Sequence, residues 1–198
     1  MRLEDSQLYL ILDTAGKSPD QLDSFCTDAI AGGADMVQVL FNDEQKISVD
    51  LLKRIKEICK HDDALFLLQN NADLALEVEA DGILLDSSSM PIGQIRAVLG
   101  MDAIVGILSK NKTDAELGIE VGADYILHSE GIACASVFAA LPGAVGTPLF
   151  AAGINTIEEA RQIVADGIYR LCIHSNSLAE SNVTEQIAEY SRLLGRCI

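Results

Sequence analysis

The sequence has no tryptophan, few other aromatic residues and few cationic side chains. Its 198 residues include 14 Lys and Arg against 30 Asp and Glu, which gives a formal net charge of −16. Nucleic acids and anionic membrane surfaces are bound by clustered Lys and Arg. We therefore expect no nucleic-acid partner and no membrane partner, and an anionic ligand would need local hydrogen-bond donors.

Long apolar runs and linker segments are also missing. The N-terminus carries Glu4 and Asp5, and the first apolar run, Leu8 to Leu12, is far shorter than the ~20 residues of a membrane-spanning helix. The five cysteines are odd in number and irregularly spaced, which indicates reduced thiols and a cytoplasmic protein. No Pro-rich or low-complexity stretch divides the chain, so we expect one domain over residues 1–198.

A short pattern recurs along the chain: a helical end, then Ala-Asp, then an apolar run. The four Asp residues are Asp35, Asp81, Asp124 and Asp166, which lie 46, 43 and 42 residues apart. Such a spacing matches about two strand-plus-helix units, with helices of ~11 and strands of ~5 residues. Four pairs make eight units, and right-handed βα units close into a barrel. The repeat therefore predicts an α/β fold, a single (β/α)8 TIM barrel.

The candidate strands are continuous apolar runs, as expected where both faces of a sheet are buried. They are Leu8–Leu12, Met36–Phe41, Ala64–Gln69, Gly82–Leu85, Ala103–Leu108, Asp124–His128, Pro148–Ala151 and Tyr169–Ile173. Helical patterns separate them at Ser18–Ala31, Ser48–Lys60, Asn71–Glu79, Pro91–Leu99, Thr113–Val121, Thr156–Ala165 and Ser181–Leu194, with a short one near Ala135–Ala140. Ser18 with Pro19, and Thr156 with Glu159, are typical helix starts.

The active end of such a barrel is built from residues that follow the strands. We predict substrate-binding residues there, namely Gln38, Asn70, Asn71, Ser109 and Lys110. The predicted catalytic residues are His128 and Glu130, because a carboxylate beside an imidazole can move protons. Other polar residues at strand ends are Asn42, Ser87 to Ser89 and His174.

A phosphate site is predicted after the last two strands, where these barrels bind phosphate through backbone N–H groups and helix N-termini. Its residues are Gly153, Ile154, Asn155, Ser175 and Asn176. Such a site needs no Lys or Arg. The same residues have structural alternatives, since Gly153 could serve a tight turn and Ser175 and Asn176 could cap the last helix. Asn70 and Asn71 could likewise cap a helix, and His128 and His174 could be hydrogen-bonded structural residues.

With these positions fixed, the chain resembles the thiamine phosphate synthase superfamily, which includes a thiazole tautomerase branch. The resemblance rests on Gln38, Asn70 to Leu76, Asp81-Gly82, Gly106, Asp124-Tyr125 and Gly153-Ile154. It implies the barrel fold, thiamine biosynthesis and an Mg-dependent transferase that displaces diphosphate from a pyrimidine with a thiazole phosphate. The tautomerase branch has His where this chain has Glu130, with His128 two residues earlier.

The chain departs from the family pattern at its charged positions. Gln-x-Arg-x-Lys is replaced by Gln38-Val39-Leu40-Phe41-Asn42, and Asn-Asp-Arg by Gln69-Asn70-Asn71. His-Leu-Gly-Gln-x-Asp becomes Leu84-Leu85-Asp86-Ser87-Ser88-Ser89. Two metal-binding carboxylates and three cations are thereby lost, so Mg is a possible cofactor without its family ligands. Losing three cations could weaken diphosphate binding by roughly 6 kcal/mol, or about four orders of magnitude.

We therefore expect a divergent thiamine phosphate synthase-like protein that binds a thiazole or pyrimidine phosphate at the C-terminal rim. Two alternatives stay open: a non-catalytic phosphate-binding or interaction protein derived from that family, and a thiazole tautomerase-like isomerase. The expected partner is a small phosphorylated molecule, and a homodimer is a further possibility because apolar helix faces on such barrels often pair.

Overall fold

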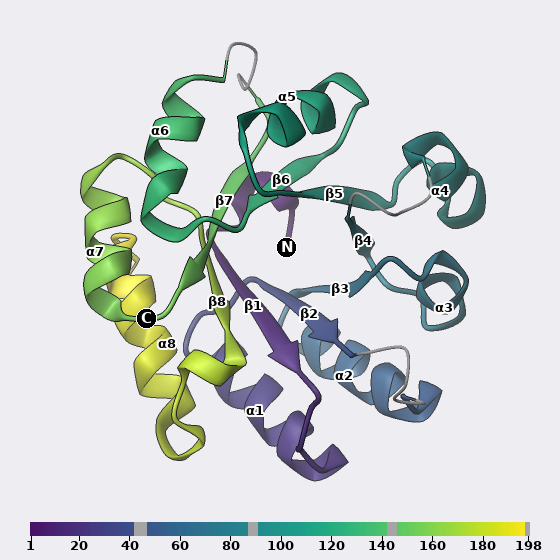
Figure 1. Cartoon of the computed structure of the whole chain (residues 1–198). Helices are drawn as coiled ribbons and strands as arrows, with labels where there is room; N and C mark the ends of the chain where they lie inside the picture. The colour runs from purple at the N-terminus through teal and green to yellow at the C-terminus, as the bar shows by residue number, and fades with distance from the viewer. Residues whose placement is uncertain (42–46, 87–90, 142–145, 197–198) are drawn as a thin grey trace.

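The computed structural model describes residues 1–41, 47–86, 91–141 and 146–196, and its eight parallel strands close into a barrel in chain order. The predicted (β/α)8 barrel is therefore confirmed. Figure 1 shows the strands around the centre and the helices outside them. The strands are β1 (Leu8–Asp13), β2 (Met36–Leu40), β3 (Leu65–Gln69), β4 (Gly82–Leu85), β5 (Ile104–Ser109), β6 (Tyr125–His128), β7 (Leu149–Ile154) and β8 (Leu171–His174).

One α-helix follows each strand, and the described ranges also contain four short 3-10 helices. The α-helices are α1 (Pro19–Ala31), α2 (Val49–His61), α3 (Ala72–Glu77), α4 (Ile92–Leu99), α5 (Lys112–Glu120), α6 (Cys134–Ala139), α7 (Ile157–Ala165) and α8 (Val183–Leu193). The 3-10 helices are η1 (Leu3–Asp5), η2 (Gly131–Ala133), η3 (Ser175–Ser177) and η4 (Glu180–Asn182). Thr156 and Glu159 form the predicted capping box, and the predicted N-cap Ser18, followed by Pro19, also forms one with Gln21. No helix in the described ranges is long and apolar enough to cross a membrane.

The predicted strand and helix bounds differ from the observed ones by at most three residues. The largest difference is at β7, which continues through Gly153 to Ile154 instead of ending at Ala151. The strand predicted from Tyr169 begins at Leu171. Two groups of predicted rim residues, Asn42 and Ser87 to Ser89, lie outside the described residues.

Aromatic rings fill the inside of the barrel. Tyr9, Tyr125 and Phe150 are fully buried and meet edge to face, with ring centroids 5.7 to 6.0 Å apart. Gly106 on β5 makes this packing possible, because a Cβ there would lie 2.1 Å from the Tyr125 ring. The interior is thus a packed core, and ligands must bind at its ends.

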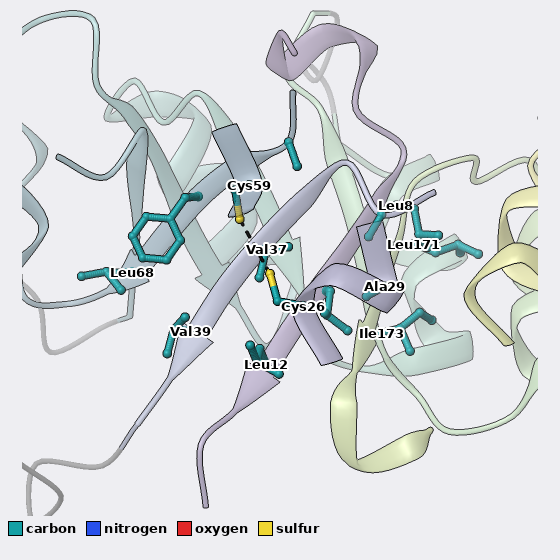
Figure 2. Close-up of a cluster of buried hydrophobic side chains, with 14 of the residues drawn as sticks. Leu8, Leu12, Cys26, Ala29, Val37, Val39, Cys59, Leu68, Leu171 and Ile173 are labelled. Atoms are coloured by element: carbon teal, nitrogen blue, oxygen red, sulfur yellow. Dashed lines mark hydrogen bonds between the residues drawn. The ribbon is translucent and has the colours of Figure 1, made fainter. Parts of the chain in front are cut away.

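A second core fills the space between the strands and the surrounding helices. Figure 2 shows part of it, where the thiols of Cys26 on α1 and Cys59 on α2 point at each other. Their sulfur atoms are 3.9 Å apart and both residues are buried. The hydrogen bond with Cys59, and then burial, raise the pKa of the Cys26 thiol far above its ordinary value. These thiols pack as small apolar side chains between the two helices.

The repeated aspartates lie at the N-terminal ends of the strands, opposite the predicted rim. Asp35 precedes β2, and its carboxylate accepts hydrogen bonds from the backbone of Gln7 and Leu8 at the start of β1, at 2.8 and 2.9 Å. Asp81 accepts from Phe66 N on β3 at 2.8 Å, and Asp124 from Val105 N on β5 at 2.7 Å. Each carboxylate therefore joins two neighbouring strands.

Each of these three carboxylates also forms an ion pair with a Lys or Arg side chain. Arg196 binds Asp35 through two nitrogen atoms, at 2.9 and 2.7 Å. Lys56 on α2 binds Asp81 at 2.6 Å, and Arg96 on α4 binds Asp124 at 2.9 Å. The fourth repeat differs. Asp166, at the end of α7, is exposed, and its carboxylate accepts a hydrogen bond from Gln162 of the same helix.

The buried pair Ser109 and His128 lies at the ends of β5 and β6. Ser109 Oγ and His128 Nδ1 are 2.8 Å apart, and the His128 ring packs edge to face on Phe138 of α6. Nε2 of His128 is buried without a hydrogen-bond partner among the described residues. Burial lowers the pKa of His128, so the neutral ring is the form that the fold accommodates.

We predict that Asp35→Asn lowers the free energy of unfolding by about 3 kcal/mol, because it leaves Arg196 without its ionic partner at a buried site. The Asp35 side chain is only 2% exposed. Urea denaturation checks this, with Asp166→Asn as the matched control from the fourth repeat. Equal losses for the two variants would contradict the structural role given to the first carboxylate.

We also predict a pH-dependent contribution from His128. The unfolded chain takes up a proton on this residue near pH 6.5, whereas the folded protein does so only at lower pH. Stability is therefore lost as the pH falls below about 6.5, at up to ~1.4 kcal/mol per pH unit for one such group. Denaturation between pH 8 and pH 5 should show a shallower loss for His128→Gln than for the wild type; parallel curves would refute it.

Candidate functional site

A cavity of about 330 Å³ opens at the C-terminal ends of β7, β8 and β1. It contains Gly153, Ile154, Asn155 and Asn176, four of the five residues predicted to bind phosphate. His174, which was predicted only as a polar residue at a strand end, also lines the cavity. The sequence did not indicate the remaining lining residues, which are Ile11, Ala152, Cys172 and Ser177. Since no Lys or Arg of the described residues lines the cavity, its polar surface there consists of backbone groups, amides, a hydroxyl and an imidazole.

Gly153 occupies a backbone position that only glycine fits well. Its φ is +76°, and a Cβ would lie 2.4 Å from the carbonyl oxygen of Ser129 on the neighbouring loop. The pairing of β7 with β8 also shifts register between Ala151 and Ile154. Close packing of β7 against the loop that follows β6 therefore accounts for the glycine, whether or not a ligand contacts it.

His174 is the imidazole that lies at the mouth of the barrel. It lies two residues after Cys172, which belongs to the interior core, and both residues line the cavity. Nδ1 of His174 accepts a hydrogen bond from Asn176 N at 3.2 Å, so the neutral ring carries its proton on Nε2. Burial lowers the pKa of His174, and the nearby Lys17 acts in the same direction against Asp13. The ring is therefore a neutral donor near pH 7.

Ser175 and Asn176 attach the end of β8 to the end of β1. Ser175 is buried, and its Oγ accepts from Asp13 N at 3.0 Å. The Asn176 amide donates to Asp13 Oδ2 at 2.9 Å, while Ala15 N donates to the other oxygen. These contacts fix the wall of the cavity, and the Ser175 hydroxyl faces away from solvent.

The start of α7 already holds a carboxylate. Glu159 Oε2 accepts from the backbone of Asn155 at 2.7 Å and of Thr156 at 3.3 Å. These two N–H groups are the ones that a phosphate at this helix end would seek. A phosphate bound there would have to displace Glu159 or use the other donors of the cavity.

Gln38 on β2 is buried inside the barrel. Its Oε1 accepts a hydrogen bond from the Tyr9 hydroxyl at 2.5 Å, and its Nε2 donates to Gln69 Oε1 at 3.0 Å. The Tyr9 hydroxyl is in turn 3.2 Å from that of Tyr125. Gln38 thus connects the buried tyrosines to the polar edge of the mouth.

Of the other predicted site residues, Ser109 and His128 contact each other, but away from the rim cavity. His128 and Ser109 pack on the helix-facing side of the sheet, whereas Glu130 and Lys110 are exposed on loops. Asn71 caps α3 by accepting from Leu74 N at 3.0 Å. The placement of His128 does not support contact with a ligand at the mouth.

The donor set fits magnesium poorly. Among the described residues, no group of three or more His, Cys, Asp or Glu side chains converges as metal ligands would. Asp86 lies at the end of β4, where its Oδ2 accepts from Asn70 Nδ2 at 2.7 Å. Mg²⁺ in such sites is held by one or two carboxylates together with substrate phosphates. Asn70, which stands where the family pattern has a carboxylate, accepts a hydrogen bond from Asp86 N at 3.0 Å.

A second cavity of about 340 Å³ lies on the outer wall between α4 and α5. Its lining is mainly apolar and includes Ile107, Leu117 and Val121. None of the predicted site residues lines it. The rim cavity at β7 and β8 is therefore the one where the predicted polar residues gather.

Comparison with known proteins agrees with this architecture. The family described as thiamine monophosphate synthase matches residues 8–176. A thiamine-phosphate synthase of Methanoculleus marisnigri is 30% identical over 192 residues, covering 89% of this chain and 90% of that protein. One from Fusobacterium nucleatum is 35% identical over 130 residues, or 64% of this chain.

The matched segment spans 62% of the Fusobacterium protein and 36% of a Synechocystis thiamine-phosphate synthase, which is less than two thirds of either. Among solved structures, thiamine phosphate pyrophosphorylase from Pyrococcus furiosus superposes with a TM-score of 0.78 at 21% identity, covering 96% and 95% of the two chains. That likeness concerns the fold. With a family match over most of its length, the chain belongs to the thiamine monophosphate synthase family.

Proposed function

We propose that this chain binds a small heteroaromatic monophosphate, such as a thiazole phosphate, in the cavity at the ends of β7 and β8. The observation that carries the proposal is the gathering of Gly153, Asn155, His174 and Asn176 around one opening of about 330 Å³. This volume is typical of small-molecule sites, which combine apolar walls with a few polar groups. Family membership supports a ligand of thiamine biosynthesis.

The neutral lining favours a monophosphate over a diphosphate. His174 Nε2–H and the polar groups of Asn155 and Ser177 supply single hydrogen bonds, which suit one phosphate group. A diphosphate carries more charge and is usually held by several cations. The family cations at the ends of β2 and β3 are replaced here by Leu40 and Asn71.

These substitutions lead us to propose that the Mg-dependent coupling of the family is absent or strongly reduced. Asn70 and Asp86 hydrogen-bond to each other twice, through Asn70 Nδ2 at 2.7 Å and Asp86 N at 3.0 Å. This pair occupies the region where family members hold metal and diphosphate. A binding protein derived from a synthase is consistent with such an arrangement.

An isomerase-type proton transfer is the second candidate, and the placement of His174 favours it. This imidazole lies at the cavity, and its lowered pKa leaves the neutral form available near pH 7 to accept or donate a proton. His128 and Glu130, which the sequence suggested for this role, lie outside the cavity lining.

We predict that a thiazole monophosphate stabilises the wild-type protein, by about 2.7 kcal/mol when its concentration is 100 times Kd. Diphosphate with Mg²⁺ should give no comparable shift. His174→Phe should weaken binding by about tenfold or more, since one hydrogen bond to a charged group is lost. Thermal denaturation and calorimetric titration measure both effects.

Lys110→Met is the matched control, because Lys110 is exposed on the rim and absent from the cavity lining. Its affinity should equal that of the wild type. No binding of the monophosphate by the wild type, or stabilisation by diphosphate with Mg²⁺ alone, would overturn the proposed function. Formation of thiamine phosphate from both precursors at the rate of a family synthase would overturn the loss of coupling.

A further inference from the structure

The cavity between α4 and α5 has no role in the proposed function. It lies outside β4 and β5, on the helix-covered wall of the barrel (Figure 1). Its volume of about 340 Å³ is within the range of small-molecule sites. Most of the described residues that line it are apolar, and no Lys or Arg is among them. The cavity therefore differs in chemistry from the polar one at the ends of β7 and β8.

The α4/α5 cavity reaches the sheet between the two helices. Val105 and Ile107 of β5 both pack in the core between the strands and the helices, where Val105 is fully buried but Ile107 is only partly buried. Ile107 lines the cavity. On α5, Leu117 and Val121 line it too, and they remain 56% and 50% exposed. Neighbouring apolar side chains left open in this way are typical of a ligand-binding groove.

Gly93 keeps the cavity open on the side of α4. It lies in the first turn of this helix, and its φ is not in the left-handed region, so the backbone would accept another residue. A Cβ at Gly93 would meet no atom within 4 Å. The other glycine of the lining, Gly118, is explained by packing, because a Cβ there would lie 2.6 Å from Cδ1 of Ile126. Packing does not explain Gly93, whose missing side chain leaves space for a ligand.

The charged groups of the described lining lie at one end of the cavity. Asp114, Leu117 and Val121 share one face of α5, because they are three or four residues apart. Asp114 is in the first turn of α5, and Asp86 directly follows β4, so both lie toward the C-terminal rim. Val121 follows the last residue of α5 at the opposite end. The cavity thus combines two carboxylates at its rim end with apolar walls beyond them.

Asp114 has an oxygen atom that can accept from a ligand. Its Oδ2 accepts hydrogen bonds from Lys110 N at 3.1 Å and from Asn111 Nδ2 at 3.0 Å. Oδ1 accepts none from the part of the chain that the structure describes. Asp86, whose Oδ2 accepts from Asn70, adds a second negative charge. This end of the cavity therefore favours a positively charged group.

We propose that the α4/α5 cavity binds a small amphiphilic cation, which carries an ammonium or similar group on an apolar body. The cationic group donates to Asp114 Oδ1 at the rim end. The apolar body packs against Ile107 and Leu117 and fills the space at Gly93. Burial of apolar surface supplies affinity, and the carboxylates select for charge. The inference is independent of the proposed function, because the two cavities share no described lining residue.

Calorimetric titration of the full chain with 2-phenylethylammonium tests this assignment. The neutral 2-phenylethanol and the anionic 3-phenylpropanoate serve as ligands of similar shape. The wild type should bind the cation at least tenfold more tightly than either of them, because only the cation forms a charge-assisted hydrogen bond with Asp114. Ethylammonium, which lacks the apolar body, should bind too weakly to measure.

Two substitutions test the position of the ligand. Gly93→Leu should weaken binding of 2-phenylethylammonium by tenfold or more, because the new side chain fills the cavity. Gln94→Leu is the matched control, since Gln94 is the exposed neighbour on α4 and does not line the cavity. Asp114→Asn should weaken binding of the cation by about tenfold and leave that of 2-phenylethanol unchanged. The amide oxygen of Asn can still accept from Lys110 N, and the melting temperature without ligand checks folding.

Several results would overturn the inference. Equal affinity of the wild type for 2-phenylethylammonium and 2-phenylethanol would refute selection for a cation, and no binding of the cation at millimolar concentration would refute the site. A folded Gly93→Leu variant with wild-type affinity would place the ligand elsewhere. A wild-type dimer that Gly93→Leu dissociates in sedimentation equilibrium would make the cavity an interface between copies. None of these results affects binding of a thiazole phosphate in the β7/β8 cavity.

Discussion

The barrel depends on a carboxylate placed before each of the strands β2, β4 and β6 at its N-terminal face. Asp35, Asp81 and Asp124 each begin one strand through the backbone while their side chains bind amides of the preceding strand. One aspartate thus fixes the register between two neighbouring strands. The β7/β8 pair lacks this contact, and among the described strand pairs it is the one whose register shifts. The rim cavity also lies at the ends of β7 and β8. The candidate site therefore lies at the strand pair whose register is irregular.

Much of the fold could be predicted because apolar runs and helix caps are local signals. The site was harder to predict, because both faces of a parallel strand are buried and its sequence shows no alternation. His128 and His174 both end an apolar run, yet one packs against helix α6 and the other lines the cavity. The two-residue spacing from Cys172 to His174 places both side chains on the same, inward face of β8, and this spacing is what separates His174 from His128. The contact between Asp13 and Asn176 joins residues 163 positions apart, which spacing alone does not reveal.

The two ends of the barrel differ in their charged side chains. The described cations that form close pairs with the repeated aspartates serve the N-terminal face, where they stabilise the barrel. At the C-terminal rim, backbone groups, amides and a neutral imidazole predominate, and Glu159 occupies the start of α7. The ligand that we propose for this rim would be held by its fit to the cavity and by a few directed hydrogen bonds. Such a site differs from a charged clamp, whose attraction extends farther and is more sensitive to salt.

The tyrosines inside the barrel give the protein an intrinsic optical signal. Without tryptophan, its near-ultraviolet fluorescence comes from four tyrosines, and Tyr9 and Tyr125 are fully buried. The Tyr9 hydroxyl donates to Gln38, which reaches Gln69 at the mouth. A molecule that reorients Gln69 would therefore alter the phenol hydrogen bond two side chains away, and with it the emission. Tyrosine fluorescence therefore reports on a change at the mouth of the barrel through the chain from Gln69 to Gln38 and Tyr9.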